Sequence, residues 1–107
     1  MLDYKVSPPA ERFIKKIKDK KLKNEFHAAI NEIRKNPDIG SPKKGNLSGI
    51  LGYDIKYAGV NYEIAYEVVE LDGQLLIIIL AGTRENFYEE LARYIKKYRK
   101  QLLDNIS

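Results

Sequence analysis

Apolar and polar residues alternate along the chain with two different periods, and the period indicates the type of element. A period of two predicts a strand near the N-terminus and two more in the middle of the chain, over residues 2–6, 53–57 and 62–68. Each has one apolar and one polar face, which is typical of a strand covered on one side. The run LLIIIL at residues 75–80 does not alternate, so we expect a central strand that is covered on both faces.

Three other segments carry apolar residues at helical spacing and predict a helical hairpin followed, later in the chain, by a C-terminal helix. Ser7 before Pro8 and Pro9 is a typical N-cap of the first helix, and Asn36 before Pro37 ends the second. The apolar stripes are Ala10, Phe13, Ile14 and Ile17 in the first helix, Leu22, Phe26, Ala29, Ile30 and Ile33 in the second, and Phe87, Leu91, Tyr94, Ile95, Tyr98 and Leu102 in the third.

Turn and cap signals separate these elements. Residues 37–52 are rich in Gly, Pro, Ser and Asn and predict a loop. Asp72 and Gly73 predict a hairpin turn, and Asn86 with Glu89 predicts a capping box at the last helix. The order of strand, two helices, three antiparallel strands and helix indicates an α+β fold, with helices against one face of a small antiparallel sheet. The 107 residues are expected to form a single domain, 1–107, around one core.

Composition restricts the class of protein and its compartment. The chain has no cysteine, which excludes disulfides and thiolate chemistry and fits a reducing cytoplasm. No run of apolar residues is long enough to span a bilayer, and the first ten residues do not resemble a signal peptide. Residues 1–50 hold 12 basic and 6 acidic side chains, whereas residues 51–107 hold 7 and 9. The basic first half fits nucleic acid or an acidic protein as a partner, and equally a plain solvated lysine surface.

Two stretches carry a resemblance to a known family. YDIKYAGVNYEIAYEV (residues 53–68) is similar to the paired strands of the RelE/ParE superfamily of toxins, and AGTRENFYEEL (residues 81–91) is similar to its last strand and final helix. The length, the order of elements and the basic helical hairpin fit as well. The resemblance covers about residues 2–97.

The resemblance implies a toxin of a type II toxin–antitoxin pair, bound by a cognate antitoxin in a hetero-oligomeric complex. In the RelE branch the activity is ribosome-dependent cleavage of mRNA without a metal ion or another cofactor, and we expect this activity first. In the ParE branch the target is DNA gyrase and no catalysis is involved. An inactive antitoxin-binding protein is the third interpretation.

Residue by residue, the resemblance implies a catalytic site of positive side chains. Lys56 matches the strand lysine of the family, Arg84 matches its strand-end arginine, and Tyr88 lies near its terminal tyrosine. Metal-free RNA cleavage requires a base for the 2′-hydroxyl and a group that stabilises the extra negative charge on the phosphate. Arg84 is expected to clamp the scissile phosphate, Lys56 to hold it, and Tyr88 to stack on a base or pass a proton. Arg84 and Tyr88 are four residues apart, so packing at a helix start is the alternative explanation.

Two departures from the family pattern alter this site. Asp54 and Glu63 stand where basic residues are expected, and residues 51–90 contain only two basic side chains against eight acidic ones. Glu63 is therefore either a general base or an ion-pair partner of Lys56 across neighbouring strands. A phosphodiester would bind weakly unless other lysines contribute. The candidates for RNA binding are Lys43 and Lys44 in the loop and Lys16, Lys20 and Lys23 in the helical hairpin.

Overall fold

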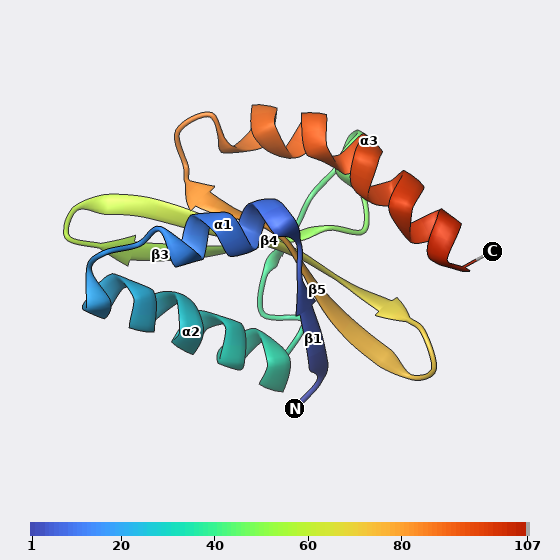
Figure 1. The fold of residues 1–107 in the computed structure, drawn as a ribbon, viewed down its shortest axis with the longest axis horizontal. Coiled ribbons are helices and arrows are strands. Elements are labelled where there is room, and N and C mark those ends of the chain that lie inside the picture. The colour runs from blue at the N-terminus through green and yellow to red at the C-terminus, as the bar shows by residue number, and fades with distance from the viewer. Residues whose placement is uncertain (107) are drawn as a thin grey trace.

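The backbone forms a five-stranded sheet with helices on both faces (Figure 1). This computed structural model describes residues 1–106, with side chains up to Gln101. The elements in chain order are β1 (Asp3–Val6), α1 (Pro8–Lys15), α2 (Lys20–Lys35), β2 (Ser41–Pro42), the 3-10 turn η1 (Gly45–Leu47), β3 (Leu51–Tyr57), β4 (Val60–Glu70), β5 (Gln74–Thr83) and α3 (Phe87–Ile106). Every predicted helix and strand is present, and β2 and η1 lie inside the predicted loop.

The strand order in the sheet is β1-β5-β4-β3-β2. β5, which contains the unbroken apolar run, is central as predicted, between β1 and β4. The pairs β2–β3, β3–β4 and β4–β5 are antiparallel, but β1 runs parallel to β5. The prediction of an antiparallel sheet was therefore wrong for β1. The helices α1 and α2 lie between β1 and β2 in the chain, so β1 does not form a hairpin with the next strand. It lies instead at the edge of the sheet, parallel to β5.

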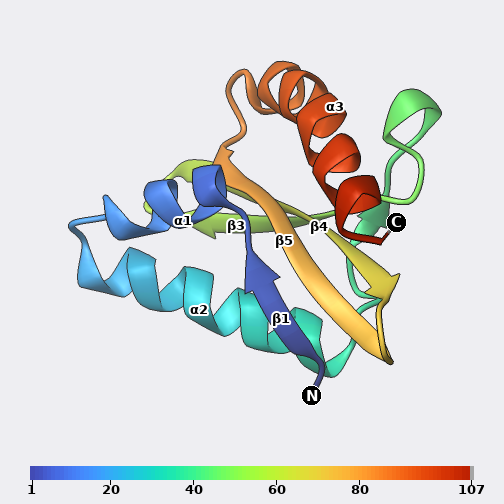
Figure 2. The same ribbon diagram turned by 45° about the vertical axis from the view of Figure 1, so that its right-hand side comes forward.

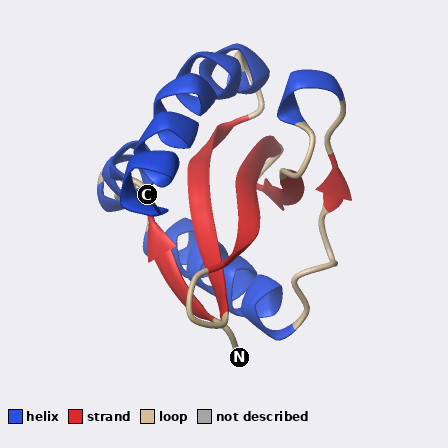
Figure 3. Cartoon of the chain, turned by 90° about the vertical axis from the view of Figure 1, so that its right-hand side faces the viewer, coloured by secondary structure: helices blue, strands red, loops and turns tan. Residues whose placement is uncertain are grey.

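The three helices form two layers, one on each face of the sheet (Figure 2). α1 and α2 bury their predicted stripes with alternate residues of the strands, such as Ile64 and Tyr66 of β4. α3 packs on the opposite face against Ala65, Ile79 and Leu80, and the helices can be seen on both sides of the strands in Figure 3. The prediction that all helices cover one face was wrong for α3. The physical reason is the apolar run itself, since a strand without a polar face requires a cover on each side.

The N-terminal ends of α1 and α3 differ in how far they match the predicted caps. Ser7 caps α1 as predicted, because its side chain accepts a hydrogen bond of 3.2 Å from the backbone N–H of Ala10. Asn86 does not form the predicted capping box: its φ of 60° lies in the left-handed region rather than in the extended region of an N-cap. Asn tolerates this conformation, which the sharp turn between β5 and α3 imposes. Among the described residues, no helix has the length and apolar character that a membrane span requires.

Candidate functional site

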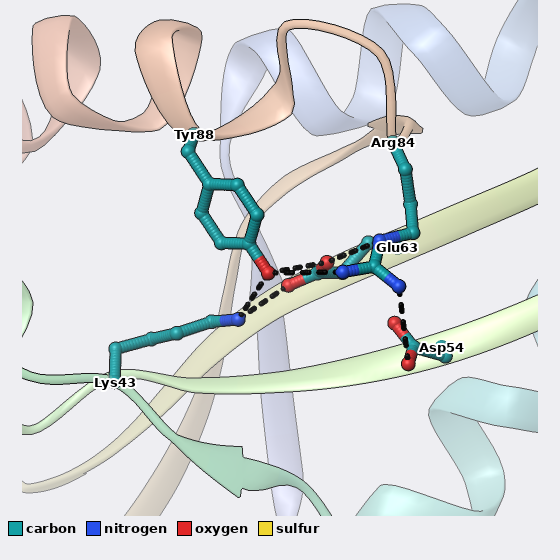
Figure 4. Close-up of polar contacts among 5 residues, drawn as sticks. All are labelled: Lys43, Asp54, Glu63, Arg84 and Tyr88. Atoms are coloured by element: carbon teal, nitrogen blue, oxygen red, sulfur yellow. Dashed lines mark hydrogen bonds and ion pairs between the residues drawn. The ribbon is translucent and has the colours of Figure 1, made fainter.

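Five side chains from separate elements meet on the sheet face that carries α3 (Figure 4). Lys43 directly follows β2, Asp54 lies on β3, Glu63 on β4, Arg84 directly after β5, and Tyr88 in the first turn of α3. Asp54 and Glu63 are direct partners in the β3–β4 register, so both carboxylates emerge side by side on one face. We call this group the five-residue cluster.

Glu63 lies at the centre of the five-residue cluster with a side chain that is only 1% exposed. Its Oε2 lies 2.8 Å from Nζ of Lys43, and its Oε1 lies 3.6 Å from Nε of Arg84. The contact with Lys43 is an ion pair without hydrogen-bond alignment, and Oε2 has no other polar partner. A buried carboxylate is tolerated only where opposite charge and hydrogen bonds match it, so Glu63 depends on its neighbours.

Tyr88 joins the two cations to Glu63 through its hydroxyl group. The hydroxyl oxygen accepts hydrogen bonds from Nζ of Lys43 at 2.9 Å and from an Nη of Arg84 at 3.4 Å, and the hydroxyl donates to Oε1 of Glu63 at 3.2 Å. Because a phenol has one proton and two lone pairs, the two cationic donors leave only Glu63 to receive the proton. The hydroxyl proton of Tyr88 therefore points to Glu63.

Arg84 lies at the open edge of the five-residue cluster, with its side chain 45% exposed. Its backbone N–H donates to the carbonyl of Asn61 at 2.9 Å, which fixes the turn after β5. The hydrogen bond to Tyr88 and the charge of Asp54, 3.8 Å away, raise the already high pKa of the guanidinium. Arg84 thus remains charged at every physiological pH and faces solvent.

Lys43 is more enclosed than a loop lysine is expected to be, with a side chain 14% exposed. Burial alone would lower the pKa of its ammonium group, but the close negative charge of Glu63 and the hydrogen bond to Tyr88 raise the pKa above its usual value. The ammonium also lies 4.5 Å from the centroid of the Tyr88 ring, within the range of a cation–π contact. The lysine is accordingly held in its charged form inside the cluster.

The other predicted site residues lie outside this group. Lys56 is exposed on β3 opposite Asn61, and the predicted pair between Lys56 and Glu63 is wrong, because Glu63 pairs with Lys43 and Arg84 instead. Lys44 is exposed beside Lys43. Lys16, Lys20 and Lys23 lie at the turn between α1 and α2, exposed except for the half-buried Lys23.

Sequence reasoning named four of the five residues but missed their arrangement. Asp54 appeared only as a departure from the family pattern, and Lys43 as an RNA-binding residue. The period-two pattern signals that Asp54 and Glu63 share a face, but nothing in the sequence brings the loop lysine to them. No group of three or more potential metal-ligating side chains occurs within the described part of the chain.

The charges of the cluster determine what it can do chemically. Lys43 and Arg84 are balanced by Asp54 and Glu63 at close range, so the group is not a general anion-binding patch. It does offer a half-exposed guanidinium next to a hydroxyl whose proton is already directed to a carboxylate. That arrangement suits the stabilisation of a negative charge together with a proton transfer.

Comparison with solved structures shows the same fold in a group of bacterial toxins. A mutant of the E. coli toxin RelE in the free state, with two arginines replaced by alanine, matches with a TM-score of 0.70 at 14% identity, over 90% of this chain and 96% of that one. RelBE2 from Mycobacterium tuberculosis, solved as a toxin–antitoxin complex, matches with a TM-score of 0.58 at 18% identity, over 78% and 98% of the two chains.

Sequence comparison gives the family. A search of curated proteins gives no match. A sequence model of the ParE-like toxins of type II bacterial toxin–antitoxin systems matches residues 5–92, which is most of the chain. The predicted membership of the RelE/ParE superfamily is therefore confirmed: this chain belongs to the ParE-like toxins of type II toxin–antitoxin systems, on a fold that it shares with RelE.

Proposed function

We propose that this toxin inhibits translation by cleaving mRNA on the ribosome, and that the five-residue cluster is its active site. The observation that carries the proposal is the hydrogen-bonded connection from Arg84 through the Tyr88 hydroxyl to the buried Glu63. Neighbours with the same fold, including RelE, and the half-exposed position of Arg84 at the edge of the cluster support it. The protein acts in the cytoplasm, where its ribosomal target lies.

In the proposed reaction the 2′-oxygen attacks the adjacent phosphorus, which forms a cyclic phosphate and breaks the bond to the 5′-oxygen. The guanidinium of Arg84 turns to the phosphate, where it stabilises the charge that develops. This movement frees a lone pair on the Tyr88 oxygen, which takes the 2′-hydroxyl proton while the phenol proton passes to Oε1 of Glu63. The departing 5′-oxygen takes a proton from water, and the hydroxide that remains is neutralised by the proton that Glu63 then releases, which restores the starting state.

Lys56 and the hairpin lysines have a binding role in this proposal. Lys56 shares the sheet face of Asp54, two residues away along β3, and is exposed. Lys16, Lys20, Lys23 and Lys44 provide further positive charge for the phosphates of mRNA and ribosomal RNA. Since the cluster itself is neutral, affinity for RNA depends on these outer lysines.

We further propose that a cognate antitoxin binds this chain in a hetero-oligomeric complex. The E. coli RelBE and Mycobacterium tuberculosis RelBE2 structures are toxin–antitoxin complexes, and the family is defined by such pairs. Co-purification of the toxin with the product of the adjacent reading frame tests this proposal. Two proteins that elute separately would contradict it.

Inhibition of DNA gyrase is the second candidate function. The neutral charge balance around Arg84 favours it, because a surface of paired charges suits a protein target better than a phosphodiester, and the matching family is ParE-like. Purified toxin that blocks supercoiling while translation continues would establish this function. Toxin with neither effect would be an inactive antitoxin-binding protein.

The decisive variant for the leading proposal is Arg84→Ala, because Arg84 is half-exposed and its loss leaves the core intact. We expect R84A to reduce mRNA cleavage in a translation extract about 100-fold or more, which is the usual cost of losing a group that stabilises developing charge. The measurement is single-turnover cleavage on ribosomes, with the 5′ ends mapped by primer extension. Arg93→Ala is the matched control, since Arg93 is exposed on α3. Equal cleavage by R84A and R93A would exclude Arg84 from the reaction.

A further inference from the structure

Lys43 differs from the other lysines of the basic first half in how firmly it is held. Its backbone N–H donates to the carbonyl of Ile50 at 2.8 Å, directly beside the β2–β3 pair of Pro42 with Leu51. The side chain runs inward and is only 14% exposed, whereas the adjacent Lys44 is exposed. Lys43 therefore belongs to the edge of the sheet and not to a mobile loop.

The ammonium group of Lys43 is directed into the cluster by three contacts. Nζ lies 2.8 Å from Oε2 of Glu63 and 2.9 Å from the Tyr88 oxygen, and it lies over the Tyr88 ring. An ammonium group has three N–H donors, and these contacts direct it inward. Little of the group remains for a phosphate in solution.

Gly52 provides the space in which Lys43 and Glu63 meet. A Cβ atom at Gly52 would lie 2.8 Å from both Cε and Nζ of Lys43 and would collide with Oε2 of Glu63. A Cβ atom does not approach other heavy atoms this closely, so a larger residue at position 52 would displace the ion pair. Gly52 on β3 therefore leaves the space that the ion pair of Lys43 and Glu63 occupies.

We propose that Lys43 is a positioning residue, which neutralises Glu63 and holds the Tyr88 hydroxyl in place, rather than an RNA-binding residue. In the proposed reaction Arg84 leaves the Tyr88 oxygen for the phosphate. Lys43 then keeps the hydroxyl in its orientation, with its proton toward Glu63, at the moment of transfer. This role rests on the proposed function, but the contacts on which it depends exist without substrate.

The test compares Lys43→Met with Lys44→Met, which removes the same charge one residue away. We expect K43M to lower the cleavage rate at saturating ribosome concentration about 10-fold or more, with the half-saturating concentration unchanged. K44M, which removes one of the outer RNA-binding lysines, should raise the half-saturating concentration. The second readout needs no activity: in protein labelled at its tyrosine rings with ¹³C, the ring signals of Tyr88 should shift in K43M and stay in place in K44M.

The outcomes separate this inference from the proposed function. If wild-type toxin cleaves no mRNA, the proposed function fails, while the Tyr88 signals still report whether Lys43 positions the ring. Tyr88 ring signals that K43M leaves unchanged would overturn the inference. So would a K43M variant that, like K44M, changes only the half-saturating ribosome concentration. If K43M does not fold, comparison of K43M/E63Q with E63Q serves instead, because the double variant has no buried carboxylate without a partner.

Discussion

Two glycines on the strands that flank β4 illustrate how single residues determine the cluster. Gly52 lies directly under the ion pair of Lys43 and Glu63, and Gly82 lies opposite Glu63 on β5. A Cβ at Gly52 would collide with both side chains, whereas at Gly82 the nearest atom is Cδ1 of Phe87, at an ordinary 3.7 Å. The same added methyl group is therefore expected to disturb the structure at Gly52 and to be tolerated at Gly82.

We predict that Gly52→Ala displaces the ends of Lys43 and Glu63 while the sheet persists. The free energy of unfolding should fall by about 1–3 kcal/mol, as for other overpacked sites, and mRNA cleavage should fall with it. Gly82→Ala is the control and should change unfolding by less than about 1 kcal/mol. Urea denaturation measures both variants. Equal stability of G52A and wild type would show that position 52 has room for a side chain.

Glu67 is a second carboxylate on the α3 face of β4, and its environment is less favourable than that of Glu63. Burial raises the pKa of Glu67, although the hydrogen bond from Tyr98 and the charge of Arg99 partly oppose the shift. A carboxyl group whose pKa is higher in the folded state binds protons more tightly when folded. It therefore reduces stability as pH rises through its folded pKa, and the reduction is absent below its unfolded pKa.

We predict that Glu67→Gln removes this pH dependence. The gain in stability of E67Q over wild type should be larger at pH 7 than at pH 4, because the wild-type carboxyl destabilises the fold as pH rises above its unfolded pKa, whereas the amide does not titrate. Glu70→Gln, on the same strand but exposed, should show no such difference. Thermal denaturation of both proteins at the two pH values is the measurement. An equal gain in stability at pH 4 and pH 7 would show that the pKa of Glu67 is not raised by folding.

Among the elements, the segment between α2 and β3 has to be fixed before Lys43 can be placed. Tyr66, fully buried on β4, donates to the carbonyl of Pro37 at 2.7 Å and accepts from the N–H of Gly40 at 2.8 Å. Arg99 of α3 donates to the carbonyls of Asn46 and Ser48 at 2.7 and 3.0 Å. The segment is thus tied to the sheet at its start and to α3 near its end.

We predict that Tyr66→Phe loosens this segment without affecting the rest of the sheet. Loss of the hydroxyl leaves the Gly40 N–H and the Pro37 carbonyl without their partner, so the free energy of unfolding should fall by about 1–2 kcal/mol. Amide hydrogen exchange should rise in residues 38–44 before it rises elsewhere. Tyr53→Phe is the control, because no hydrogen bond of its hydroxyl occurs among the described residues. Unchanged amide exchange of residues 38–44 in Y66F would show that the hydrogen bonds of Tyr66 do not hold this segment in place.

At the scale of the whole molecule, the densest group of lysines lies between α1 and α2, the helices on one face of the sheet, whereas the cluster lies on the face that carries α3. The six lysines of the α1–α2 turn, which we call the lysine turn, are Lys15, Lys16, Lys18, Lys20, Lys21 and Lys23. The turn lies near the hairpin of β3 and β4, where Tyr57 donates to Asp19 at 2.9 Å. Affinity for RNA and chemistry on RNA are therefore expected to respond to different substitutions.

We predict that the variant K16Q/K20Q/K23Q weakens ribosome binding and lowers its salt dependence. Each lost phosphate contact should reduce the slope of log affinity against log salt by roughly 0.7–0.9, whereas cleavage at saturation should persist. K96Q/K97Q/K100Q removes the same charge from exposed positions of α3 and should leave the slope near its wild-type value. The measurement is ribosome binding between about 50 and 300 mM salt. Equal slopes for both variants would exclude the lysine turn as an RNA-binding surface.

The sequence by itself determined the elements and the chemistry available to them. Period-two and period-3.6 patterns are local properties, so the strands 53–57, 62–68 and 75–80 and all three helices were predicted from residues within each segment. Arg84 and Tyr88 were named from the resemblance to the RelE/ParE superfamily, Glu63 from a departure from its pattern, and Lys43 as a basic residue of the loop. These inferences require no contact between distant residues.

Only the tertiary structure decided which of these residues meet. The parallel pairing of β1, the position of α3 on the second face and the inward course of Lys43 depend on contacts between segments far apart in the chain. Lys43 and Lys44 are adjacent and identical in type, yet one is enclosed by Glu63 and the other faces solvent. The difference arises from the short β2–β3 pairing and from the missing side chain at Gly52. The burial of Lys43 and its pairing with Glu63 are properties of the assembled fold, and for that reason the pattern of residues along the chain did not contain them.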